Sequence, residues 1–266
     1  MISGRPLVSV IIPTKNSVLT IGRCIKSLLA QRYSPVEIIV VDGESLDATC
    51  EISASLGSKV YRTRMERSQA RNFGARMAKG EYLLFVDSDM VTEPDLVGEC
   101  LAHCGYRTAC VIPQKTIGRS FWSKCVAIGE TLRQGDTTYV APRFMSKGLF
   151  SEAKGYDETL VYGEDKDLHS RLLSSGVKMV FVGSQIYHID NLSIADRTRK
   201  IVYYGKKIPQ YRARHRSRSM YHILLPSPRY IKKISLVSNP WYFFGFVFLK
   251  LVEYESFIAG AMFNRV

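Results

Sequence analysis

The stretch Glu81-Tyr-Leu-Leu-Phe-Val-Asp87-Ser-Asp89 decides the fold class, because an apolar, β-prone run ends abruptly in two carboxylates. Two earlier runs have the same form: residues 8–12 end at Pro13, and residues 36–41 end at Asp42. Short strands are also expected at residues 60–61 and 180–182. Apolar residues recur at helical spacing in residues 17–31, 45–56 and 68–79. Strands that alternate with helices predict an α/β fold with a mostly parallel sheet.

Polar loops follow three of these strands: Pro13-Thr14-Lys15-Asn16, Asp42-Gly43-Glu44-Ser45 and Asp87-Ser88-Asp89. Ligands of open α/β sheets bind at the carboxyl ends of the strands, so we expect the three loops to meet there. The side chains of Asp87 and Asp89 point to the same side of an extended chain, and a cation between them would relieve their repulsion. Hard oxygen ligands favour Mg²⁺ or Mn²⁺. An ordinary strand-exit turn is the alternative.

The composition is that of a globular protein, with 46% apolar and 23% charged residues among 266. It excludes collagen-like, low-complexity and wholly disordered chains. The sequence has no Walker loop, G-x-G-x-x-G, H-E-x-x-H or G-x-S-x-G motif, which removes several common enzyme classes. Its six cysteines form no C-x-x-C pair, so we expect reduced, buried thiols in a cytosolic compartment.

Basic residues are concentrated near the C-terminus: residues 197–233 carry 12 basic side chains and no acidic one. Such a block binds an anionic partner, either a membrane surface or nucleic acid. The apolar run at residues 241–249 follows it. Nine helical residues span roughly 13–14 Å, under half of a hydrocarbon core of ~30 Å. An interfacial helix within residues 235–263 is therefore favoured, with a membrane span or a hairpin packed on the protein as alternatives.

Four motifs resemble, in order, those of family 2 glycosyltransferases, and together they cover about residues 7–190. They are Val8-Ser-Val-Ile-Ile-Pro13-Thr-Lys-Asn16, Ile39-Val-Val-Asp42-Gly-Glu-Ser45, the segment from Arg71-Asn72 to Asp89, and Gly155-Tyr-Asp-Glu158 followed by Gly163-Glu164-Asp165. The resemblance implies a GT-A fold, a nucleotide-sugar donor, a divalent metal (Mn²⁺ or Mg²⁺) and inversion at the anomeric carbon.

The resemblance also implies roles for individual residues. Asp165 would be the general base, with Glu164 beside it, which suits an inverting displacement. The metal ligands would be Asp87, Asp89 and His188. The nucleotide sugar would be bound by Pro13, Thr14, Asn16, Asp42, Arg71, Asp87, Ser88 and Asp89.

The sequence departs from the family pattern at two places that bear on the donor and on the number of sugars transferred. The usual Asp-Asp-Gly-Ser loop is here Asp42-Gly43-Glu44-Ser45, which leaves the donor nucleotide open. The Gln-x-x-Arg-Trp motif of processive relatives is replaced by Gln210-Tyr-Arg-Ala-Arg214, so we expect transfer of a single hexose.

We therefore predict a catalytic domain at residues 1–195 and a membrane-associating helical segment at residues 196–266. The enzyme would act at the cytoplasmic face of a cell membrane, moving mannose from GDP-mannose to a lipid-linked acceptor of the polyprenyl or dolichyl type. A UDP-sugar-dependent synthase is the alternative within the class. A nucleic-acid-binding protein is the alternative of another class, which the apolar run after the basic block argues against. A non-catalytic relative is a third, which the intact acidic motifs argue against.

Overall fold

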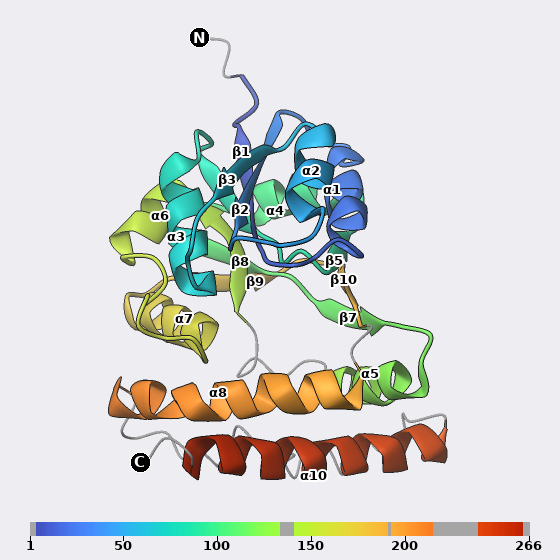
Figure 1. Ribbon diagram of the computed structural model, residues 1–266. Helices are drawn as coiled ribbons and strands as arrows, with labels where there is room; N and C mark the ends of the chain where they lie inside the picture. The colour runs from blue at the N-terminus through green and yellow to red at the C-terminus, as the bar shows by residue number, and fades with distance from the viewer. Residues whose placement is uncertain (1–3, 134–140, 191–192, 215–238, 263–266) are drawn as a thin grey trace. The chain divides into compact units, whose positions relative to one another are not determined.

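The computed structural model describes residues 4–133, 141–190, 193–214 and 239–262 (Figure 1). The chain divides into two compact units. The first comprises residues 1–114, 140–158 and 164–189, and the second comprises residues 115–139, 159–163 and 190–266. This division is not a single cut at residue 195, because two earlier segments cluster with the C-terminal helices.

Seven strands form the main sheet of the first unit, in the order β3-β2-β1-β4-β8-β6-β9. They are β1 (Val8–Thr14), β2 (Val36–Asp42), β3 (Lys59–Arg62), β4 (Tyr82–Phe85), β6 (Thr108–Val111), β8 (Pro142–Ser146) and β9 (Lys178–Phe181). Only β8 runs against its neighbours, pairing antiparallel with β4 and β6. The predicted, mostly parallel α/β sheet is confirmed.

Helices cover both faces of this sheet (Figure 1). One core contains α1 (Ile21–Leu29) and α4 (Leu96–His103), with α2 (Thr49–Ser55) packed against it. The other contains α3 (Arg67–Met77), α6 (Lys147–Glu152) and α7 (Glu164–Ser174). Strand β1 supplies both cores because successive side chains point to opposite faces: Val10 and Ile12 enter the first core and Ile11 the second.

A short antiparallel pair of strands supplements the main sheet. Strand β5 (Met90–Thr92) pairs with β10 (Ile186–Ile189), so that His188 lies opposite Met90. This pairing brings the end of the first unit back beside the segment that follows β4. The six cysteines are free thiols, five of them buried and Cys50 half-buried, as expected for small apolar residues.

Helices α1 and α2 begin later than the sequence predicts, at Ile21 and Thr49 rather than at residues 17 and 45. The intervening polar residues form loop hydrogen bonds instead. The Ser17 N–H donates to Thr49 Oγ1 (2.8 Å), and Ser45 bonds to Asp42. Short polar side chains compete with helical hydrogen bonding in this way.

Three helices make up most of the described part of the second unit: α5 (Phe121–Arg133), α8 (Ile194–Arg214) and α10 (Pro240–Met262). Strand β7 (Gln114–Ile117) leads into this unit. Helices α8 and α10 lie side by side (Figure 1) and touch at Gly205 and Gly260. A Cβ on Gly260 would lie 2.2 Å from the Val202 carbonyl oxygen, so only glycine allows this approach.

The predicted C-terminal helical segment is thus confirmed over residues 194–214 and 240–262. Gly245, Ser256 and Gly260 of α10 are buried, and Glu253 is half-buried. None of the helices in the described ranges combines the length and apolar character that a membrane span requires. The greater part of the basic block, residues 215–233, lies outside the described residues.

Candidate active site

The three loops that follow β1, β2 and β4 meet at the carboxyl edge of the sheet, as predicted. The Asn16 N–H donates to Ser45 Oγ (2.7 Å), and Asn16 Oδ1 accepts from the Leu46 N–H (2.8 Å). The hydroxyls of Ser17 and Ser88 are 2.8 Å apart. The order of the strands in the sheet explains this convergence. Strand β1 lies between β2 and β4, so the carboxyl ends of the three strands are adjacent.

The Asp42 carboxylate holds its own loop. Asp42 is fully buried; Oδ2 accepts the Ser45 N–H (2.8 Å) and Oδ1 accepts the Ser45 hydroxyl (2.5 Å). The neighbouring Thr14 hydroxyl is also buried and has no hydrogen-bond partner among the described residues. Most buried hydroxyls in proteins have a hydrogen-bond partner, so this one is unusual. Pro13, beside Thr14, is paired with Val41 within the sheet.

Arg71 joins two carboxylates from distant parts of the sequence. Its buried guanidinium donates to Asp87 Oδ1 (2.7 Å) and to Glu164 Oε1 (3.1 Å), and lies 5.1 Å from the centre of the Tyr156 ring. The negative charges raise the pKa of Arg71 although burial opposes them. Arg71 was expected to bind the nucleotide; here it bridges the strand end at Asp87 and the start of α7.

Asp87 receives a second guanidinium, from Arg143, whose Nη2 lies 3.1 Å from Oδ2. Burial raises the pKa of Asp87, but Arg71 and Arg143 outweigh burial and hold it well below its usual range. The sequence reasoning missed Arg143, because residues 142–146 were not expected to be a strand. Since β8 is antiparallel, its first residues lie at the carboxyl end of β4, which places Arg143 beside Asp87.

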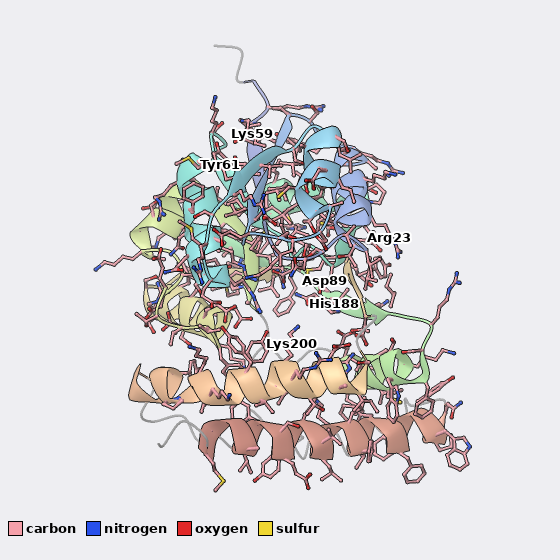
Figure 2. All side chains as sticks on the ribbon, viewed as in Figure 1. Arg23, Lys59, Tyr61, Asp89, His188 and Lys200 are labelled. Atoms are coloured by element: carbon pink, nitrogen blue, oxygen red, sulfur yellow. The ribbon has the colours of Figure 1, made fainter. Side chains whose placement is uncertain are left out.

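Asp89 and His188 form a second polar pair (Figure 2), with His188 Nε2 3.0 Å from Asp89 Oδ2. The Ile189 N–H donates to the Asp89 carbonyl (2.7 Å), which fixes the two segments together. Both side chains are partly exposed, 36% for Asp89 and 27% for His188. Of the three predicted metal ligands the structure brings these two together, whereas Asp87 faces the arginines. The described residues contain no group of three or more potential ligands.

Glu164 and Asp165 open helix α7 but differ in surroundings. Glu164 is buried and accepts hydrogen bonds from Arg71 and Arg67 (3.4 Å to the latter), whereas Asp165 is half-buried. Burial raises the pKa of Glu164, the adjacent Asp165 raises it further, and the two guanidinium groups oppose the shift. Asp165 is thus the more accessible carboxylate for a reacting hydroxyl.

Asn72 locks the segment before α7 in place. Its amide donates to the Tyr156 carbonyl (2.8 Å) and accepts from the Tyr156 N–H (2.9 Å), and it also donates to Glu158 (3.0 Å). Gly155 has φ +64°, and a Cβ there would lie 2.6 Å from the Asn72 oxygen. The Arg71-Asn72 and Gly155-Tyr156 motifs therefore act together to position the loop that leads toward the acidic pair.

The comparisons with known proteins agree with this geometry. Residues 9–137 match the model of glycosyl transferase family 2. Glycosyltransferase GlyG of Streptococcus pneumoniae serotype 4 is 26% identical over 211 residues, which are 68% of this chain and 69% of that protein. The alignments with four further curated relatives span only 57% to 63% of their lengths. Residues 9–137 thus form a glycosyl transferase family 2 domain.

Two solved structures show the same fold at low identity. The mannosyltransferase PcManGT of Pyrobaculum calidifontis, in complex with GDP-Man and Mn²⁺, has a TM-score of 0.60 and 16% identity, over 98% of this chain and 88% of that one. S. aureus TarS 1-349, in complex with UDP-GlcNAc, has a TM-score of 0.57 and 17% identity, over 97% and 91%. The first unit is thus a GT-A-type α/β fold.

Proposed function

We propose that this protein is a metal-dependent, inverting glycosyltransferase that moves one hexose from a nucleotide sugar to a lipid-linked acceptor, with mannose from GDP-mannose as the leading donor. The observation that carries this proposal is the Arg71 bridge. It holds Asp87, next to the predicted donor and metal residues, in the same site as Glu164 and Asp165. Transfer of a sugar needs one group that stabilises the leaving diphosphate and another that acts on the attacking hydroxyl, and the two must lie in the same site.

The proposed reaction assigns the proton to Asp165. Its carboxylate accepts the proton of the acceptor hydroxyl while that oxygen forms a bond to the anomeric carbon. The bond from the anomeric carbon to the diphosphate oxygen breaks, and the nucleoside diphosphate leaves on the opposite face, which inverts the configuration. Glu164, buried and bonded to Arg71 and Arg67, orients the start of α7 and so positions Asp165.

The Asp89 and His188 pair suits a divalent cation. A carboxylate oxygen and an imidazole nitrogen on two hydrogen-bonded segments form a mixed donor set that accommodates Mn²⁺, and Mg²⁺ less readily. When bound, such a cation supplies positive charge for the leaving diphosphate. Asp87 would contribute indirectly, since its ion pairs with Arg71 and Arg143 hold the loop that carries Asp89.

A transfer assay with paired variants tests this proposal. Purified protein would be incubated with Mn²⁺, a polyprenyl phosphate and GDP-mannose or a UDP-hexose, and the glycolipid measured by mass spectrometry. Asp165→Asn and Asp89→Asn should each reduce transfer at least 100-fold while the circular dichroism spectrum is unchanged. Asp95→Asn, on the exposed surface, is the control. Wild-type turnover by Asp165→Asn would refute the assignment.

The curated relatives and solved neighbours favour a transferase over a nucleic-acid-binding protein, and they support both donor classes. PcManGT was solved with GDP-Man and TarS with UDP-GlcNAc. A UDP-sugar-dependent enzyme is therefore the alternative outcome of the same assay. Steeply salt-dependent binding of RNA without sugar transfer would instead support nucleic-acid binding.

The exposed apolar side chains of α10 support the proposal of a lipid-linked acceptor. Trp241, Phe244, Phe248 and Leu251 are each at least half exposed, and their spacing of three or four residues puts them on one side of the helix. Over residues 194–209, helix α8 carries five basic residues and one acidic residue, Asp196. An apolar helix face with nearby positive charge suits an interfacial position on an anionic membrane, at the cytoplasmic face.

Vesicle sedimentation tests the membrane proposal separately. Binding to vesicles with 30% phosphatidylglycerol should exceed binding to pure phosphatidylcholine and fall with added salt. The double variant Phe244→Asp/Phe248→Asp should lose most binding. Leu173→Asp, at a half-exposed leucine of α7, is the matched control. Equal binding by the α10 variant would refute the proposed surface.

A further inference from the structure

The five residues that precede the acidic pair belong to the second unit, although their chain neighbours on both sides belong to the first. Residues 159–163 cluster with the C-terminal helices, whereas residues 140–158 and 164–189 are part of the first unit. Glu164 and Asp165 therefore follow directly on a segment that packs with α8 and α10. The start of α7 is thus tied to the second unit by the chain itself.

An aromatic cluster holds this segment. The Tyr162 ring meets two rings of α8, Tyr204 and Tyr211, with ring centres 5.6 and 6.3 Å away. It also meets Phe257 of α10, at 5.7 Å. Leu160, 1% exposed, is buried among the same helices. Pairs of rings at such distances stabilise a core beyond the apolar area that they bury. These five side chains are called the Tyr162 cluster below.

The last residue of the segment touches the same cluster. Gly163 has φ +77°, a conformation that glycine adopts without strain, and a Cβ there would lie 2.5 Å from the Tyr211 ring. The backbone directly before Glu164 is therefore in close contact with an aromatic side chain of α8. A shift of that ring would move the backbone that leads into the acidic pair.

The direction of the Asp165 side chain follows the backbone of the first turn of α7. Its Oδ1 accepts the N–H of the next residue, Lys166 (2.8 Å), a bond made within that turn. Glu164, by contrast, is held by Arg71 of the first unit. Misplacing a reacting group by about 1 Å can slow a reaction about 100-fold, so the backbone position at Gly163 bears on the rate.

We propose that the Tyr162 cluster positions the catalytic base, so that α8 and α10 serve turnover as well as membrane attachment. Tyr162, Tyr211 and Phe257 are positioning residues, which act through the backbone at Gly163 and take no proton themselves. The packing of the C-terminal helices sets where the Asp165 carboxylate meets the acceptor hydroxyl. The inference rests on the proposed function, because it takes Asp165 as the base.

Steady-state transfer by the full chain tests the inference. The assay would use Mn²⁺, GDP-mannose or a UDP-hexose, and polyprenyl phosphate in detergent micelles, where attachment to a bilayer does not limit the rate. Phe257→Leu removes the ring that Tyr162 meets. Its kcat should fall about tenfold or more, whereas its KM for the donor should stay within about twofold of wild type.

Phe246→Leu is the matched control, because Phe246 is a phenylalanine of the same helix with 6% exposure that packs in a different core, with α5. It should keep kcat within about twofold of wild type. Amides of residues 168–170, which donate to the first turn of α7, give a readout without substrate. Their hydrogen exchange should accelerate in Phe257→Leu and not in Phe246→Leu.

A second pair of variants decides the question if Phe257→Leu does not fold. Tyr162→Leu should lower kcat as Phe257→Leu does, and Tyr162→Phe, which keeps the ring, should restore it. Wild-type kcat in folded Tyr162→Leu or Phe257→Leu would overturn this inference alone, and so would a Tyr162→Phe variant as slow as Tyr162→Leu. Absence of transfer by the wild type with either donor would overturn the proposed function, and this inference with it.

Discussion

Replacing Arg71 by Met should destabilise the first unit by about 3–5 kcal/mol, the range for breaking a buried ion pair by removing one partner. Arg71 and Glu164 are only 5% and 6% exposed, so solvent cannot take over the lost interaction. Asp87 keeps Arg143 and Glu164 keeps Arg67, which limits the loss to this range. Methionine retains most of the side-chain volume, so the change is chiefly one of charge.

Hydrogen exchange measures the loss of stability in the first unit. Both tryptophans, Trp122 and Trp241, belong to the second unit, so tryptophan fluorescence would not report on the sheet. Exchange of core amides in β1 and β4 should accelerate by about two to four orders of magnitude, since 1.4 kcal/mol corresponds to about a factor of ten.

The control is Arg32→Met, which removes an exposed ion pair with Asp95 whose side chains are 74% and 59% exposed. That loss should be about 0–1 kcal/mol. If Arg71→Met accelerates exchange no more than Arg32→Met does, the bridge does not hold the site together and the argument for the proposed function fails.

Three further predictions follow from the packing and the charges. Gly260→Ala should destabilise the second unit by about 1–3 kcal/mol, because its Cβ would meet the Val202 carbonyl; tryptophan fluorescence in urea measures this, and an unchanged unfolding midpoint would contradict it. The pKa of Glu164 is raised in the folded protein above its usual 4.5. The unfolding free energy of the wild type minus that of Glu164→Gln should therefore fall as the pH rises through and above 4.5. Urea denaturation at several pH values measures this quantity, and a rise with pH would contradict the prediction. Asn72→Ala should leave the Tyr156 backbone groups unpaired and speed hydrogen exchange at residues 155–158; unchanged exchange there would show that Asn72 does not hold the loop.

Much of the first unit follows from local sequence patterns. The β-branched runs at residues 8–12 and 36–41 and the helical spacing between them predicted β1, β2 and their crossover helix, because burial on both faces requires continuous apolar strands. The edge at which the ligand loops meet also followed, since parallel strands bring their carboxyl ends together. Helix boundaries were less well predicted, because Ser17 and Ser45 hydrogen-bond across loops instead of joining the helices.

The partners of the charged residues did not follow from sequence. Arg71 was expected at the nucleotide, yet its nearest carboxylates come from residues 16 and 93 positions away. Arg143 was missed altogether, because its place beside Asp87 depends on β8 being antiparallel. Similarly, no local pattern showed that residues 115–139 and 159–163 would cluster with the C-terminal helices.

The sequence by itself determined the α/β class, the resemblance to family 2 glycosyltransferases and the set of acidic residues at the strand ends, because these depend on residue type and spacing along the chain. Only the tertiary structure decided which carboxylates are neutralised by arginine and which remain for a metal or a hydroxyl. Asp42 and Asp87 are occupied, whereas Asp89 and Asp165 are at least partly exposed. The physical reason is that ion pairing acts over a few ångströms in space, between residues whose separation in sequence carries no information about their contact.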